Sequence, residues 1–250
     1  MSNATAMPGS QLHLPLVDAE QADAVRDELW LLEDEFPHLG DALRPMSSGF
    51  FDVSEVVGDV TLIADLIPVV EQCLDEGPTL PDPVLAARLL ALLLAPGNAE
   101  TAAVQIAFGE AAGWREVREM TRLASRAHRC GLSLDEYVLD LAQRKAVPQT
   151  PLTRSLHGLT RRRPDADRIR TGVAMMRRLA ALAPDELRPA PLSIIGWLQW
   201  ARGKRALGIA YLDEAQRIEP SSQVAYGLKW LVTTNSARWL HTEAHSDSTS

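Results

Sequence analysis

The chain has 250 residues, of which 46% are hydrophobic and 23% charged, and its formal net charge at pH 7 is −8. This is the composition of a globular chain that can bury one large core or two modest ones, and the excess of Leu and Ala over Val, Ile and Tyr favours helix over strand. The longest apolar run is too short to form a helix that crosses the ~30 Å hydrocarbon core of a bilayer, so we expect no membrane segment. The N-terminus lacks the pattern of a secretory signal, so we expect a cytoplasmic protein.

The N-terminal half is predicted to consist of helices separated by short loops. Residues 1–16 carry no periodic apolar pattern and are expected to be a flexible lead-in. Pro68 should kink or divide the helix that contains it, because proline lacks a backbone donor. Asp82 followed by Pro83 is typical of a helix start. Helical spacing of apolar residues predicts helices over 18–35, 52–76 and 82–94.

The middle of the chain continues the pattern. Ser133 and Glu136 form a capping-box pair, and Pro164 with Asp165 marks another helix start. Gly113 and Trp114 are expected to separate two helices, and Gly131 to end the second of them. The predicted helices cover 98–112, 114–130, 133–145 and 165–182, with a short one within 146–163. No segment alternates apolar and polar residues, so the predicted fold class is all-α, a multi-helix bundle or array.

Residues 190–226 predict a hairpin of two amphipathic helices that are separated by Gly203, and the second helix is expected to end at Pro220. Gly196 and Gly208 are expected to lie where the helices approach closely, with Ala215 and Leu212 as their contact residues. The spacing of these residues resembles one tetratricopeptide-type helix–turn–helix. Such a unit serves either the core or a peptide-binding groove. The candidate partner surface is formed by Trp197, Trp200, Arg202 and Lys204.

A wider resemblance covers about residues 80–235. The segments LAALAPDELRPAPL, IIGWLQWARGKRALGIAYL and DEAQRIEPSSQVAYGL follow one another in the order seen near the C-terminus of an actinobacterial family, the domain-of-unknown-function family four-one-nine-two. The chain resembles only the helical half of that family, because residues 1–80 show no equivalent of its strand-bearing N-terminal half. The resemblance implies a helical fold and no particular chemistry.

The basic residues are distributed unevenly along the chain. Residues 1–100 hold 18 acidic and 3 basic residues, whereas residues 101–250 hold 15 acidic and 22 basic residues. Five arginines recur at helical spacing on one predicted face, and three more precede the helix that begins at 165. These candidate phosphate contacts are Arg115, Arg118, Arg122, Arg126, Arg129, Arg161, Arg162 and Arg163. The alternative is a solvated face partly paired with the acidic half of the chain.

Known catalytic patterns are absent from the sequence. It has no nucleophile elbow, no phosphate-binding glycine loop and no metal-ligand spacing, and the tail pair His241 and His245 lacks a third ligand. Cys73 and Cys130 are expected to be buried and reduced. We therefore predict no catalytic residue, metal or cofactor.

The sequence favours a non-enzymatic module that binds a protein partner. The alternative is a nucleic-acid-binding protein that uses the arginine-rich helix faces of residues 115–178. The expected organisation is a flexible segment over 1–16, a helical domain over 17–185, the hairpin helices packed on it over 186–240, and a disordered tail over 241–250.

Overall fold

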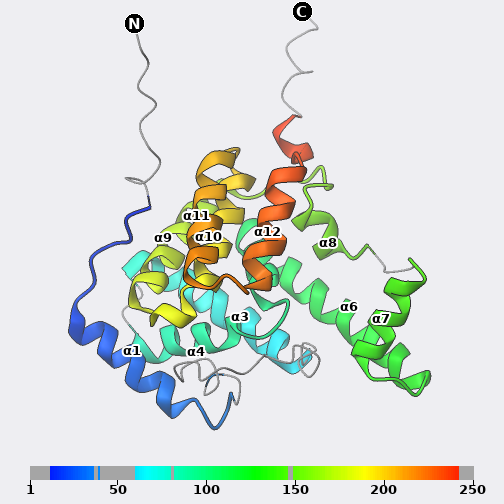
Figure 1. The fold of residues 1–250 in the computed structure, drawn as a ribbon, viewed down its shortest axis with the longest axis horizontal. Coiled ribbons are helices and arrows are strands. Elements are labelled where there is room, and N and C mark those ends of the chain that lie inside the picture. The colour runs from blue at the N-terminus through cyan, green and yellow to red at the C-terminus, as the bar shows by residue number, and fades with distance from the viewer. Residues whose placement is uncertain (1–11, 37–38, 40–59, 80–81, 146–148, 242–250) are drawn as a thin grey trace, which may run out of the picture.

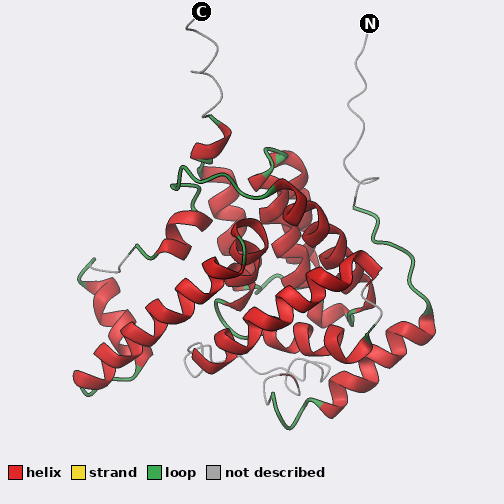
Figure 2. Ribbon diagram, turned by 180° about the vertical axis from the view of Figure 1, so that it is seen from behind, coloured by secondary structure: helices red, strands yellow, loops and turns green. Residues whose placement is uncertain are grey.

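Helices are the only regular elements in the part of the chain that the computed structural model describes, which is residues 12–36, 39, 60–79, 82–145 and 149–241 (Figure 2). The prediction of an all-α fold is therefore confirmed. The α-helices are α1 (Ala19–Leu31), α3 (Val60–Glu76), α4 (Pro83–Leu93), α5 (Asn98–Phe108), α6 (Glu110–Arg129), α7 (Leu134–Gln143), α8 (Pro151–Leu156), α9 (Ala166–Leu182), α10 (Pro189–Ala201), α11 (Arg205–Ile218) and α12 (Gln223–Thr234). Short 3₁₀ turns follow at η3 (Gly77–Thr79), η4 (Asp185–Leu187) and η5 (Arg238–Leu240).

Several helices begin where the capping residues predict. The Asp82 side chain accepts from the backbone N–H of Val84 ahead of α4, and Asp165 accepts from two N–H groups ahead of α9. At α7 the capping box is complete, because the Glu136 carboxylate accepts from the Ser133 backbone N–H at 2.8 Å and the Ser133 hydroxyl accepts from the Glu136 backbone N–H at 3.2 Å. These side chains satisfy donors that have no partner inside the helix.

The break between α5 and α6 lies at Gly109, four residues before the predicted one. Gly109 has φ +87° and ψ 164°, a conformation that only glycine adopts readily. Gly113, which was expected to separate the helices, instead lies inside α6. A Cβ there would lie 2.4 Å from Ile67 and 2.8 Å from Gln105, so this glycine lets α6 cross α3 and α5 closely.

Three further predictions differ from the structure in whole or in part. Pro68 was expected to kink or divide its helix, and it does not divide it, since α3 is one helix from Val60 to Glu76 with Pro68 exposed inside it. The first part of the predicted helix, residues 52–59, lies outside the described residues. Helix α12 was not predicted, although Ser222 caps it by accepting from the N–H of Ala225. Cys73 is buried as expected, but Cys130 is exposed because it caps the outer end of α6.

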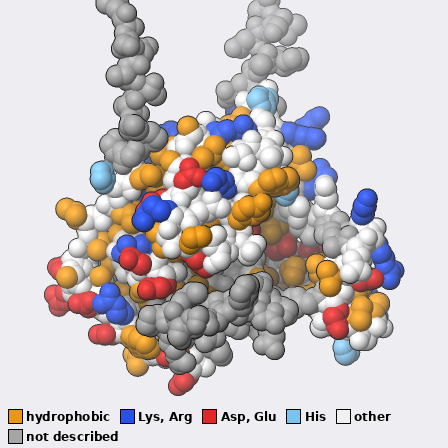
Figure 3. Space-filling view, viewed as in Figure 1, with side chains coloured by type: hydrophobic (Ala, Val, Ile, Leu, Met, Phe, Trp, Pro, Cys, Tyr) orange, Lys and Arg blue, Asp and Glu red, His pale blue; other side chains and the backbone are white. Residues whose placement is uncertain are grey.

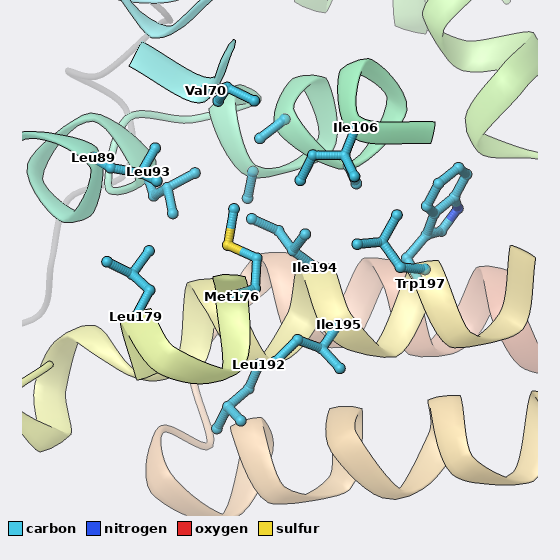
Figure 4. Close-up of a cluster of buried hydrophobic side chains, with 14 of the residues drawn as sticks. Val70, Leu89, Leu93, Ile106, Met176, Leu179, Leu192, Ile194, Ile195 and Trp197 are labelled. Carbon is cyan, nitrogen blue, oxygen red and sulfur yellow. The ribbon is translucent and has the colours of Figure 1, made fainter. Parts of the chain in front are cut away.

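Helix α10 lies at the centre of the fold and packs against α5, α9, α11 and α12 (Figure 1). Pro191 to Ala201 are all buried. Figure 4 shows Met176 and Leu179 of α9 and Ile194 of α10 in one cluster with side chains from α3, α4 and α5. The expectation that the first hairpin helix is amphipathic is therefore wrong, because α10 has no solvent-exposed face between Pro191 and Ala201.

The predicted hairpin is formed by α10 and α11, which approach at two glycines. A Cβ on Gly196 would lie 2.6 Å from Leu212 Cγ, and one on Gly208 would lie 2.6 Å from the Gly196 carbonyl oxygen. The close approach predicted for these glycines is therefore confirmed. The likeness of the hairpin to a tetratricopeptide unit stays a prediction.

A polar network ties three helices together inside this apolar framework. Arg168 of α9 makes two hydrogen bonds to the Glu71 carboxylate of α3, at 2.8 and 3.0 Å. Gln105 of α5 donates to the same carboxylate at 2.8 Å and to the Ile67 carbonyl at 2.9 Å. Although Arg168 belongs to the arginine-rich segment 115–178, this pairing makes it a structural residue between helices.

No single helix within the described ranges has both the length and the apolarity needed to cross a bilayer. Helices α4 and α5 reach that threshold only as a pair, and they meet at a bend of 118°.

Candidate nucleic-acid interface

Two residues of the predicted partner surface are buried. Trp197 and Trp200 are 0 and 1% exposed, and their rings lie 5.9 Å apart in a cluster that also contains Trp239 and Phe108. The indole N–H of Trp197 donates to the Leu156 carbonyl at 2.9 Å. The prediction of a partner surface at these tryptophans is wrong, because an apolar ring between packed helices gains more from burial than it would from solvent.

Helix α10 has no exposed face that could form one side of a peptide-binding groove along the hairpin. That helix packs against α5, α9, α11 and α12, and its residues from Pro191 to Ala201 are all buried. This packing supports the alternative, in which the hairpin serves the core. Of the predicted partner surface, only Arg202 and Lys204 are exposed.

These two cations lie at an end of the molecule where three chain segments converge. The backbone N–H of Arg238 donates to the Gly158 carbonyl at 2.8 Å, and the Trp239 indole donates to the Ala201 carbonyl at 2.9 Å. Arg205 donates to the Asn235 carbonyl. The loop of residues 157–163, the α10–α11 turn and the η5 segment are thereby joined (Figure 1).

We call this region the basic end and define it by Arg161, Arg162, Arg202, Lys204 and Arg205. All five side chains are exposed. Within the described residues, Arg161, Arg202 and Lys204 have no carboxylate partner. The sequence contains no Asp or Glu in residues 141–164, 187–212 or 220–242, so none of the three segments supplies an acid that could neutralise the cations. Figure 3 shows Lys and Arg along the upper edge of the molecule and Asp and Glu over α1 at the lower left.

Arg162 is held in place by the aromatic cluster. Its guanidinium carbon lies 5.9 Å from the centre of the Phe108 ring, and Nη2 donates to the Phe108 carbonyl at 2.8 Å. The Phe108 ring in turn meets Trp239 edge-on at 5.6 Å. The aromatic cluster therefore packs beneath the basic end, and Phe108 holds the Arg162 guanidinium in place without an acidic partner.

The other predicted phosphate contacts do not join the basic end. Arg118, Arg122, Arg126 and Arg129 are exposed on α6, which leaves the body of the molecule and packs its outer part against α7 (Figures 1 and 2). Arg122 is paired with Glu119. Arg115 is half-buried, and Arg163 follows Arg162 on the loop beside the basic end. The helical spacing predicted a shared face on α6 but not its distance from the second arginine group.

The arginines at the end of α9 hold the N-terminal segment. Arg177 donates to the His13 carbonyl, and Arg178 donates to the Leu16 carbonyl at 3.0 Å and to the Gln21 side chain. A cavity of about 490 Å³ lies beside them, bounded also by η3. Because carbonyl groups of residues 12–18 already accept from both guanidinium groups, we assign these arginines to docking that segment.

Glu116 is a buried carboxyl that the sequence did not single out. It lies on α6, is 5% exposed, and its Oε2 has no hydrogen-bond partner. Burial raises the pKa of Glu116 to about 7, against a hydrogen bond from Thr150 that lowers it, while nearby Glu119 raises it further. The native state therefore binds a proton here at a pH where the unfolded chain has released it.

We expect Glu116→Gln to stabilise the fold at pH 8 by about 1 to 3 kcal/mol. The charged carboxylate destabilises the native state above pH 7, and this cost declines as the pH falls from 7 towards the ordinary value of 4.5. The gain from the amide should therefore shrink over the same range. Urea denaturation of both proteins at pH 8 and pH 5 measures it, and an equal gain at both values would contradict the assignment.

No metal centre is apparent in the described residues, in which no three His, Cys, Asp or Glu side chains gather closely enough to hold an ion. His241 contacts the Ser236 hydroxyl at 2.6 Å, and His245 lies outside the described residues. Comparison of the chain with family models, with curated proteins and with solved structures finds no match. The resemblance of residues 80–235 to the actinobacterial family therefore stays a prediction.

Proposed function

We propose that this protein binds nucleic acid through the basic end. The observation that carries the proposal is the convergence of Arg161, Arg162, Arg202, Lys204 and Arg205 from separate segments that contain no acid. Cations brought together in this way repel one another, and a polyanion relieves the repulsion. Phosphate groups are the matching ligand, since each one neutralised releases a condensed counterion.

The arrangement of the basic end suits a backbone rather than a single small anion. Its cations are exposed side chains spread over separate segments, and the cavity beside Arg177 and Arg178 is lined by none of them. Arginine also binds phosphate through two parallel N–H donors. These features support phosphate contacts that do not depend on base sequence.

A protein partner bound along the hairpin has less support. Its two predicted aromatic anchors, Trp197 and Trp200, are buried, and its two remaining residues, Arg202 and Lys204, belong to the basic end. These two cations therefore support nucleic-acid binding more than they support a protein partner.

Reversing three charges tests the proposal. The variant Arg161→Glu/Arg202→Glu/Lys204→Glu is compared with Arg118→Glu/Arg126→Glu/Arg129→Glu on α6, which makes the same change in net charge at exposed positions. Binding of a labelled mixed-sequence oligonucleotide is followed by fluorescence anisotropy as salt is raised. We expect the first variant to lose at least ten-fold in affinity and its salt slope to become shallower by about two to three.

The α6 variant is expected to retain most of the affinity, apart from a general effect of net charge. If the α6 variant lost binding and the basic-end variant kept it, the interface would be the arginine face of α6 and the proposal would be wrong. Absence of binding by the parent protein at low salt would refute it altogether.

A further inference from the structure

Helix α12 exposes two large aromatic side chains on its solvent face. Tyr226 and Trp230 are 63 and 54% exposed, and their spacing of four residues places them on neighbouring turns of one face. Figure 3 shows hydrophobic side chains gathered over α12 in the centre of this view. The rings of Phe108, Trp197, Trp200 and Trp239, in contrast, are packed together in the interior.

Neither exposed ring belongs to the hydrophobic core. Within the described residues, Tyr226 and Trp230 have no aromatic neighbour and no side-chain hydrogen bond. Leu228, Leu231 and Val232 already anchor α12 to the core from its opposite face. Two large rings that are more than half exposed on one helix face are a candidate contact surface.

The pair is continuous with the basic end. The Asn235 carbonyl, directly after α12, accepts from Arg205. At a rise of 1.5 Å per residue, Trp230 lies ~7 Å and Tyr226 ~13 Å before that point along the helix. A strand whose phosphates contact the basic end can therefore reach both rings within a few nucleotides.

We infer that Tyr226 and Trp230 stack on unpaired bases, so that the nucleic acid bound at the basic end is single-stranded. The inference rests on the proposed function. Exposed bases offer flat faces that stack on aromatic rings, whereas a duplex keeps those faces inside its own stack. The absence of acidic residues from 220–242 favours an anionic occupant over an apolar protein segment. Lys229 is the one cation between Tyr226 and Trp230 in the sequence, and its ammonium group is paired with Asp213 of α11. The aromatic rings are therefore the groups on α12 that would contact the nucleic acid.

The test compares single-stranded and duplex oligonucleotides of about a dozen nucleotides, within the range that such sites cover. The variants are Trp230→Ala and Tyr226→Ala/Trp230→Ala, with Trp30→Ala as the matched control. Trp30 is 50% exposed on α1, which carries acidic residues. We expect the double variant to bind the single strand about ten- to a hundred-fold more weakly, while its affinity for duplex and the affinity of Trp30→Ala for either ligand stay unchanged.

Other outcomes separate this inference from the proposed function. Equal affinity of the parent for duplex and single strand, or an unchanged single-strand affinity of the double variant, would overturn the stacking role and leave the basic end as a phosphate-binding surface. If the parent bound neither oligonucleotide, the proposed function itself would fail, and this inference with it. Circular dichroism of each variant verifies that the exposed substitutions leave the fold intact.

Discussion

Replacing Gly208 with alanine is expected to lower the free energy of unfolding by about 2 to 4 kcal/mol. The new methyl group would lie 2.6 Å from the Gly196 carbonyl oxygen and 3.2 Å from the Trp200 backbone nitrogen. Both are backbone atoms, so no rotamer change can relieve the overlap. Helix α11 must instead move away from α10, which loosens the packing between these two helices.

Gly227→Ala is the matched control for this substitution. Gly227 also lies inside a helix, α12, but a Cβ there meets nothing within 4 Å. Because alanine is the better helix former, we expect this variant to be as stable as the parent or more stable by up to about 1 kcal/mol. Urea denaturation of the three proteins gives the comparison. Equal stability of the two variants would show that the hairpin tolerates a wider separation than its glycines indicate.

Replacing Trp200 with alanine is expected to lower the free energy of unfolding by about 3 to 5 kcal/mol, because truncation removes a large ring from a packed interior. The side chain is fully buried between Trp197 and Trp239, and the tip of its ring packs over Gly158. Its removal leaves a cavity where α10 meets the loop and η5. The basic end should become disordered as a consequence, since Arg162 is positioned by Phe108 of this cluster and the Trp239 indole joins η5 to Ala201 of α10.

Trp230→Ala provides the comparison with an exposed ring and should change the free energy of unfolding by less than about 0.5 kcal/mol. Near-ultraviolet circular dichroism should lose intensity in Trp200→Ala, because fixed neighbouring rings generate that signal. A stable Trp200→Ala variant with an unchanged spectrum would mean that the aromatic cluster is dispensable.

Local signals in the sequence were sufficient to locate most helices. The capping residues Asp82, Ser133 and Asp165 act through neighbours two or three residues away, so a sequence pattern specifies them completely. Gly109 and Gly113 show what local signals could not determine, namely which of the two glycines separates α5 from α6. Either glycine could have broken the helix, and the choice depends on Ile67 and Gln105, which approach from elsewhere in the chain.

The basic end could be predicted only in parts. Arg161 and Arg162 were assigned to phosphate and Arg202 and Lys204 to a protein partner, because nothing local indicates that these segments meet. The helical spacing of Trp197 and Trp200 likewise gave one shared face without showing whether it pointed inwards. The long acid-free stretches around all three segments are the one signal in the sequence that links them.

The separation of charge between α1 and the basic end has a kinetic consequence. A molecule with one acidic and one basic pole behaves as an electric dipole, and the field of a distant polyanion turns it before the surfaces touch. More collisions then begin with the basic end facing the nucleic acid. The rate of productive encounters therefore exceeds that of a protein with the same net charge spread evenly over its surface. Physiological ionic strength shortens the reach of this torque to about 8 Å, which limits the orienting effect to the last moments of approach.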